Sequence, residues 1–78
     1  MRNEKEITAK GWLLDIMICI DKIGRKEFSL KDMYTFEDEL SKLHPTNRHV
    51  RDKIRQQLQV LRDNNYLVFI GSGNYRLT

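Results

Sequence analysis

The spacing of apolar residues predicts a helix over about residues 8–23. Thr8 is expected to cap its N-terminus, and Gly24 is expected to end it. The apolar residues that share its inward face are Trp12, Ile16, Cys19, Ile20 and Ile23.

The same helix carries more apolar surface than one core requires. Leu14 and Ile18 lie opposite the inward face, so the helix is apolar nearly all round. A helix on the surface of a domain needs only one apolar stripe. We therefore expect Leu14, Ile18 and Met17 to contact something outside the core of this domain.

A second apolar stripe predicts a helix over about residues 30–43, with Ser29 as its N-cap. A short extended piece around Phe28 precedes it. The stripe consists of Met33, Phe36, Leu40 and Leu43.

A third helix is predicted over His49–Asp63, after a tight break. Pro45 disfavours the helical conformation at His44, and Thr46 or Asn47 is expected to cap the helix that follows. The inward face of this third helix consists of Val50, Ile54, Leu58 and Leu61.

The end of the chain has the pattern of a β-hairpin. Residues 66–70 and 75–78 are rich in β-branched and aromatic side chains, and Gly71–Asn74 is the expected turn between two strands. Helix, short strand, helix, helix and hairpin follow one another in the order α-β-α-α-β-β. This order predicts an α+β winged helix, and residues 1–78 have room for one domain of this kind.

Composition argues against several other classes of protein. One cysteine excludes an internal disulfide, and with two histidines it gives too few ligands for a structural zinc site. No apolar run reaches the ~20 residues that span a membrane, and the start MRNEKEITAK lacks the apolar stretch of a signal peptide. We expect a cytoplasmic protein that has no membrane partner, no cofactor, no metal and no catalytic residues.

The positive charge is concentrated in one segment. Residues 1–43 hold eight basic and nine acidic side chains, whereas residues 44–62 hold five basic side chains against Asp52 alone. This placement is typical of an element that faces phosphate, although a solvated helix face has the same look.

The outer face of the third helix has the chemistry of DNA recognition. Arginine pairs with guanine or phosphate, glutamine with adenine, and aspartate with cytosine. The first turns of a recognition helix enter the major groove. The residues expected to contact double-stranded DNA are Asn47, Arg48, His49, Arg51, Asp52, Arg55, Gln56 and Gln59.

The hairpin is the expected wing. Two glycines leave the backbone near its tip uncovered, so that Ser72 and Asn74 can approach a phosphate. Arg76, just beyond the tip, is the only charged side chain of the hairpin and is a third expected DNA contact.

These residues carry a resemblance to a known family. Over roughly residues 12–78 the chain resembles the C-terminal winged-helix domain of DpnI-type restriction endonucleases. The parts that match best are the second helix FEDEL, the turn LHP, the run KIRQQLQ with LRD at Lys53–Asp63, and the closing GSGNYRL.

The resemblance implies a function that the pattern alone does not give. In that family a nuclease domain of the PD-(D/E)xK type is joined to the winged helix, and both recognise methylated adenine in GATC. Carried over, it implies that Asn47–Gln59 contacts adenine-methylated DNA. The 78 residues lack the acidic pair and lysine of the nuclease core. A nuclease or other effector domain in a longer chain is the implied partner.

Three other functions remain to be weighed. The main alternative is a winged-helix transcription regulator that is indifferent to methylation. A winged helix that binds proteins needs no basic third helix, so the placement of charge disfavours it. A stand-alone enzyme is least favoured, because a domain this small has little room for an elaborate buried active site.

Overall fold

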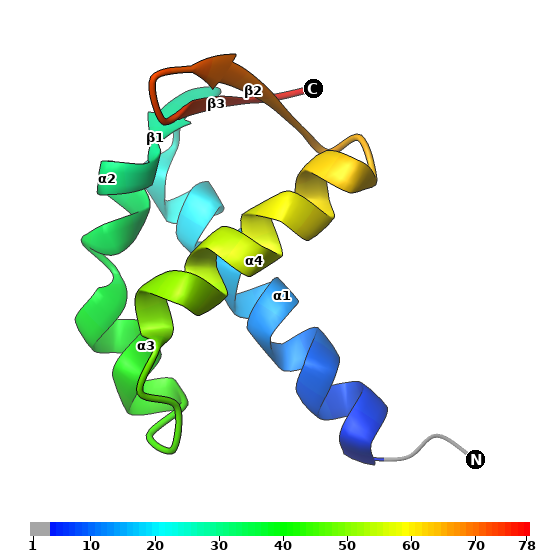
Figure 1. Cartoon of the computed structure of the whole chain (residues 1–78), viewed down its shortest axis with the longest axis vertical. Coiled ribbons are helices and arrows are strands. Elements are labelled where there is room, and N and C mark those ends of the chain that lie inside the picture. Colours follow the sequence, from blue (N-terminus) through cyan, green and yellow to red (C-terminus); the bar gives the residue numbers. More distant parts are fainter. Residues whose placement is uncertain (1–3) are drawn as a thin grey trace.

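The computed structural model describes the backbone of residues 4–78 and the side chains of residues 11–78. Three helical segments precede a C-terminal helix and hairpin, and a short strand joins the hairpin from the first half of the chain (Figure 1). The predicted α+β winged helix is confirmed. The elements are α1 (Glu4–Ile23), β1 (Glu27–Ser29), α2 (Leu30–Tyr34), α3 (Glu37–Leu43), α4 (Val50–Asp63), β2 (Leu67–Gly71) and β3 (Asn74–Leu77).

The first helix, α1, begins earlier than the sequence pattern predicts. It starts at Glu4, so the cap predicted at Thr8 is wrong, and the side chain of Thr8 lies outside the described residues. Glutamate and lysine are good helix formers, so the run Glu4-Lys5-Glu6 is compatible with a longer helix. Its end is as predicted, because Gly24 follows with a φ of 73°.

The helix predicted over residues 30–43 is interrupted. Tyr34, Thr35 and Phe36 are weak helix formers, and the Thr35 hydroxyl donates to the carbonyl oxygen of Asp32 at 2.6 Å. The backbone N–H groups of Thr35 and Phe36 bond three residues back, to Asp32 and Met33. The chain therefore forms two short helices, α2 and α3, instead of one.

The turn into α4 also differs from the prediction. His49 occupies the cap position without a capping hydrogen bond from its side chain, so the caps predicted at Thr46 or Asn47 are wrong. Asn47 instead accepts, through Oδ1, a 2.8 Å hydrogen bond from the backbone N–H of His49. This local bond bends the chain towards α4, which begins at Val50 and ends at Asp63.

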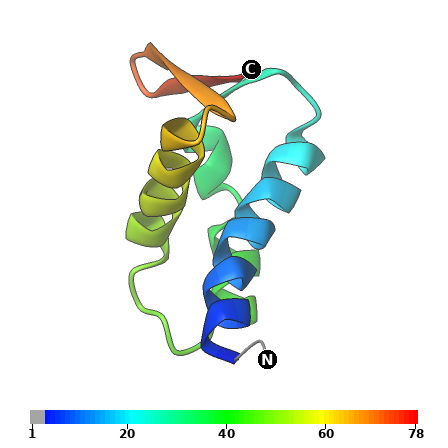
Figure 2. The same cartoon turned by 90° about the vertical axis from the view of Figure 1, so that its right-hand side faces the viewer.

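A three-stranded antiparallel sheet covers the ends of α1 and α4 (Figure 2). The strand order is β1-β3-β2, and Phe28 of β1 and Phe69 of β2 both pair with Tyr75 of the central strand. The extended piece predicted around Phe28 is thus the third strand of the wing. The backbone N–H of Leu30 donates to the carbonyl oxygen of Gly73 at 2.8 Å, which ties the tip of the hairpin to the start of α2.

The hairpin turn lies at the predicted residues, Gly71–Asn74. Gly71 and Asn74 already pair across the ladder, so only Ser72 and Gly73 form the turn. Their φ values are 53° and 73°, and two successive positive values match a type I′ turn, whose twist suits a hairpin. Glycine adopts such a φ without strain, which accounts for Gly73 at the second position.

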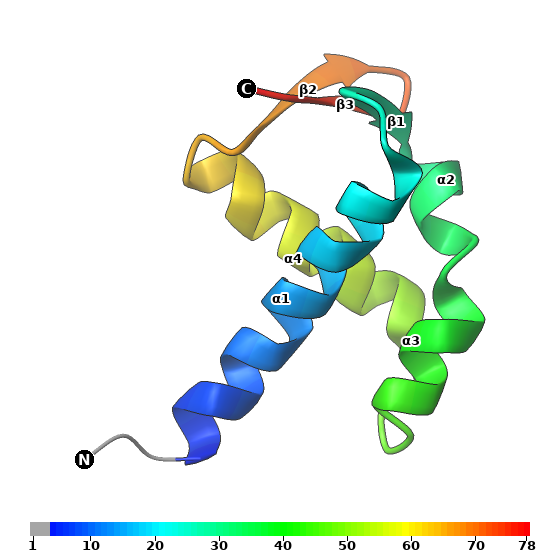
Figure 3. The ribbon, with the colours of Figure 1, turned by 180° about the vertical axis from the view of Figure 1, so that it is seen from behind.

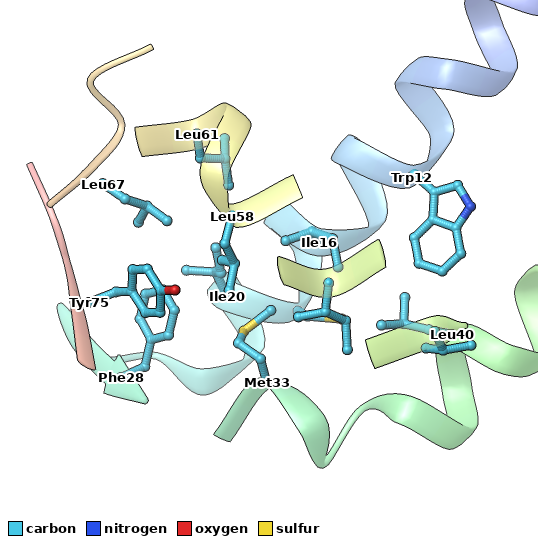
Figure 4. Packing of buried hydrophobic residues seen from close by; sticks show 13 residues of the cluster. Trp12, Ile16, Ile20, Phe28, Met33, Leu40, Leu58, Leu61, Leu67 and Tyr75 are labelled. Carbon is cyan, nitrogen blue, oxygen red and sulfur yellow. The ribbon is translucent and has the colours of Figure 1, made fainter. Parts of the chain in front are cut away.

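One cluster of buried side chains joins all the elements (Figure 4). The inward faces predicted for the helices are confirmed with one exception: Leu43 is 62% exposed, because α3 ends there and the chain leaves the core for the turn. Burial also raises the pKa of the Cys19 thiol to about 11, so Cys19 packs as a neutral side chain. The largest fully buried side chains are those of Ile16, Met33, Leu40, Ile54 and Leu58.

The outer side of α1 stays open, as its second apolar stripe predicts. Leu14 is 56% exposed, Met17 41% and Ile18 44%. None of the described helices has the length and hydropathy needed to cross a membrane. The structure leaves this stripe uncovered, and what contacts it stays a prediction.

Candidate nucleic-acid interface

The outer face of α4 is basic, because residues 44–62 hold five basic side chains against Asp52 alone. The helix has 14 residues; Val50, Ile54, Leu58 and Leu61 are buried in the core, and the arginines of the helix are exposed on its outer face. The candidate DNA contacts on and before this helix are exposed, except Asn47, which is half-buried: Asn47, Arg48, His49, Arg51, Asp52, Arg55, Gln56 and Gln59.

Three arginines line the edge of α4 that borders α2 and the wing. Arg51 lies over the ring of Tyr34, with its guanidinium carbon 4.6 Å from the ring centroid. Arg62 lies in the same way over Phe69 of β2, at 5.2 Å. The aromatic rings come from elements that flank α4 (Figure 3), so they position the arginine side chains along one side of the helix.

Arg51 also has a carboxylate partner. Its Nε lies 2.9 Å from Oε1 of Glu37, the first residue of α3. Both side chains are partly exposed, at 58% and 39%, so water screens the pair and it adds little to stability.

Arg55 joins the same network. Its Nη1 donates to the hydroxyl oxygen of Tyr34 at 3.1 Å, and its Nη2 bonds Oδ1 of Asp52 one turn earlier. Tyr34 therefore contacts both Arg51 and Arg55, two of the arginines expected to contact DNA. Asp52, an expected DNA contact, is paired with Arg55 in the free protein.

A shallow hollow lies on the other side of the α4 axis. Asp52 stands between the hollow and the arginine edge, and His49 Nδ1 lies 4.0 Å from Asp52 Oδ2. The hollow is open to solvent, and polar and charged residues line it, partly through their carbon atoms. Its lining residues are Asn47, His49, Asp52, Lys53 and Gln56.

The remaining polar side chains of α4 differ in how they are held. Gln59 donates to Asp63 at 2.9 Å and accepts from Arg62 at 3.2 Å, so the second half of the helix forms its own chain of hydrogen bonds. Arg48 lies before the first turn, exposed, and has no ion-pair partner within residues 11–78. It is available to an external anion.

The wing residues do not form one cluster with the recognition helix. Ser72 is exposed at the turn, whereas Asn74 is half-buried where β3 meets β1. Arg76 lies on the central strand, exposed, with its Nη1 3.7 Å from Glu27 Oε2. The tip is fixed to α2, so any contact of Ser72 or Asn74 with DNA would be made by a short and rigid wing.

Two interface residues were missed by the sequence analysis. Tyr34 and Glu37 lie on either side of the interruption between α2 and α3, and both reach α4. A continuous helix over residues 30–43 gives no reason to single them out. The available signal was the run Tyr34-Thr35-Phe36, whose low helix propensity could have marked the break.

No three of the histidine, cysteine and carboxylate side chains in the described part of the chain lie close enough together to hold a metal ion. The geometry instead brings guanidinium, amide, imidazole and carboxylate groups onto one exposed helix face. Such groups pair with base edges and phosphates.

Comparison with protein families matches residues 8–77 to DpnI_C, described as the Dam-replacing HTH domain. The match runs from α1 to β3 and includes every candidate contact residue named above. A helix-turn-helix domain is a DNA-binding module rather than a catalytic domain. The resemblance inferred from the sequence is thereby confirmed.

Proposed function

The chain belongs to the Dam-replacing HTH family and is a helix-turn-helix DNA-binding domain of the DpnI type, and from this premise we propose that it reads 6-methyladenine in a GATC-like duplex. In this proposal α4 enters the major groove and the wing contacts the backbone. The observation that carries it is the exposed face of α4 with the turn before it, where arginine and glutamine side chains of the helix lie beside His49 and the half-buried Asn47. The domain itself supplies recognition and no chemistry.

The free energy gained by contacting the methyl groups limits how strongly this face can distinguish methylated from unmethylated DNA. The methyl group of 6-methyladenine projects into the major groove, and burying one methyl gains about 0.8 kcal/mol, a factor of about four in affinity. Two methyls, one on each strand, give a factor of about fifteen. An unmethylated amine that loses water without gaining a partner adds roughly 1–3 kcal/mol of discrimination.

The first turn of α4 offers a place for such contacts. The two adenines of GATC occupy adjacent base pairs, so their methyl groups lie close together in one stretch of groove. The hollow lined by Asn47, His49 and Gln56 lies at the beginning of the helix. In helix-turn-helix complexes this part of the recognition helix contacts base edges in the major groove. The alkyl parts of Arg48 and Arg51 can add apolar contact beside it.

We propose further that this recognition domain serves a modification-dependent restriction endonuclease. The nuclease, or another effector, would occupy a separate part of a longer chain. The exposed stripe of Leu14, Met17 and Ile18 on α1 supports this, because it is apolar surface that the domain core leaves uncovered.

A titration with three duplexes tests the methyl reading. GATC duplexes with two, one and no methylated adenines are compared at one fixed salt concentration, with a scrambled methylated duplex as the control. Affinity should rise in steps with each methyl, by at least fifteenfold overall. Equal affinity for all three GATC duplexes would leave a winged helix of the regulator type that binds DNA and ignores methylation.

A further inference from the structure

We infer that Glu37 and Tyr34 act on Arg51 as positioning residues, holding its guanidinium so that its two terminal nitrogens face a guanine of the site. This inference rests on the proposed reading of GATC by α4. It assigns a role to two residues outside the recognition helix, on the break between α2 and α3.

The geometry of the Arg51 side chain is the first argument. The Nε of Arg51 donates to Oε1 of Glu37 at 2.9 Å. Nη1 and Nη2 of Arg51 have no hydrogen-bond partner within residues 11–78. Guanine presents O6 and N7 side by side in the major groove, and arginine contacts them in pairs through such a fork. A carboxylate bound at Nε therefore leaves the end-on pair, Nη1 and Nη2, free for this contact.

Tyr34 supplies the second restraint. The guanidinium of Arg51 lies over its ring, with 4.6 Å from Cζ to the ring centroid, and this contact restrains the guanidinium. Its hydroxyl accepts from Arg55, so the ring is itself held from α4. An arginine with a restrained guanidinium loses less conformational freedom when it pairs with a base than a mobile one does.

The charge of Glu37 has a second consequence. A carboxylate 2.9 Å from Arg51 offsets the positive charge that would attract phosphate on any duplex. The pair is exposed and contributes little to folding, so stability does not account for it. Its effect falls on DNA binding: it weakens contact with random sequence and leaves the fork available for a base edge.

The test compares two glutamates of α3. Glu37→Ala removes the carboxylate at Arg51, whereas Glu39→Ala removes one that pairs with Lys22 of α1, at 3.1 Å. Both variants change the net charge equally on the same short helix. Wild type, Glu37→Ala, Glu39→Ala and Arg51→Ala are titrated with methylated GATC, with the same duplex carrying 7-deazaguanine, which lacks the N7 acceptor, and with a scrambled duplex.

Wild type and Glu39→Ala should lose at least about fivefold in affinity when 7-deazaguanine replaces guanine, because one acceptor of a paired contact is gone. Arg51→Ala should lose less than about twofold. Glu37→Ala should lose less affinity than wild type when 7-deazaguanine replaces guanine. It should also bind the scrambled duplex about five- to tenfold more tightly than wild type does. Its plot of log K against log salt should be steeper than that of wild type by about one.

The outcomes separate this inference from the proposed function. If Glu37→Ala matches Glu39→Ala on all three duplexes, the inference is wrong whether or not methylation is read. If wild type does not distinguish methylated GATC from the scrambled duplex, the proposed function fails, and the scrambled-duplex affinities still decide whether Glu37 restrains Arg51. Melting curves check that each variant is folded, and Glu37→Gln replaces Glu37→Ala if the latter unfolds.

Discussion

The indole ring of Trp12 lies parallel to the imidazole ring of His44, with ring centroids 4.0 Å apart and an interplanar angle of 15°. The Nε2 of the same histidine lies 2.6 Å from Oδ2 of Asp15, one turn further along α1. His44 ends α3 and directly precedes the turn into α4. The two contacts therefore fasten the start of the recognition helix to α1.

Removing this histidine should destabilise the domain. We expect His44→Ala to lower the free energy of unfolding by roughly 1–2 kcal/mol, since it removes a half-buried hydrogen bond to a carboxylate and an aromatic contact. His49→Ala is the matched control, because its side chain is 81% exposed and should cost less than about 0.5 kcal/mol. Urea unfolding followed by the fluorescence of the single tryptophan measures both. Equal stability of the two variants would contradict the role of His44.

The capping box at the start of α2 should make stability depend on acid pH. The backbone N–H of Ser29 donates to the Asp32 carboxylate at 2.9 Å, and this bond, helped by the Ser29 hydroxyl and Arg25, holds the pKa of Asp32 below its usual range. A carboxyl with a lowered pKa stabilises the fold at neutral pH, and this contribution is lost as pH falls through the folded-state pKa.

Asp32→Ala isolates this contribution. At pH 7 the variant should be about 1 kcal/mol less stable than wild type, the usual size of a capping interaction. The difference should shrink as pH falls below the ordinary aspartate value of 3.8, where the carboxyl becomes protonated in both states. Denaturant unfolding across that range measures it, and a difference that stays constant with pH would contradict the assignment.

The helix faces could be predicted from the sequence because each depends on one period within one element. Val50, Ile54 and Leu58 repeat at helical spacing, so burying them fixes which side chains of α4 point outward. The break at Thr35 was missed because the apolar stripe continues across it. Met33 and Leu40 are both fully buried on either side of the interruption.

The partners of the arginines could not be predicted in the same way. Which carboxylate meets Arg51 depends on where α3 begins, and that depends on the break. Contacts between side chains of different elements follow from packing in three dimensions, and no spacing along the chain encodes them. The sequence analysis therefore located the recognition face and left out Tyr34 and Glu37, which shape its edge.

The exposed stripe on α1 should tolerate charge. Leu14→Glu is expected to cost less than about 0.5 kcal/mol of unfolding free energy, because the side chain already faces solvent in the described structure. Leu58→Ala, at a fully buried position, should cost about 2–5 kcal/mol and serves as the contrast. If Leu14→Glu were as harmful as Leu58→Ala, the stripe would be ordinary core rather than a surface for a further domain.

Substitutions of the two central arginines should weaken DNA binding without unfolding the protein. Arg51→Ala and Arg55→Ala remove exposed side chains, so circular dichroism should be unchanged while affinity falls. Both contact Tyr34, and residues with a shared partner are seldom independent. The double variant should therefore differ from the sum of the single effects by more than about 0.5 kcal/mol in binding free energy. Unchanged affinity in both single variants would mean that another surface meets the DNA.

The dependence of binding on salt should report how many basic side chains reach phosphate. Arg48 and Lys53 have no carboxylate bonded to them within residues 11–78, whereas Arg55 and Arg76 have exposed partners that a phosphate can displace at small cost. Arg51 is not counted, because the carboxylate of Glu37 offsets its charge towards phosphate. Four phosphate contacts predict a slope of about −3 to −4 for log K against log salt, at roughly −0.9 for each. If Arg55 and Arg76 keep their carboxylate partners, only two phosphate contacts remain, and these predict a slope near −2.

A titration of the scrambled duplex over 50–200 mM salt, a range in which such slopes are resolved, distinguishes the two values. A slope near zero would mean that this face of α4 does not contact the DNA.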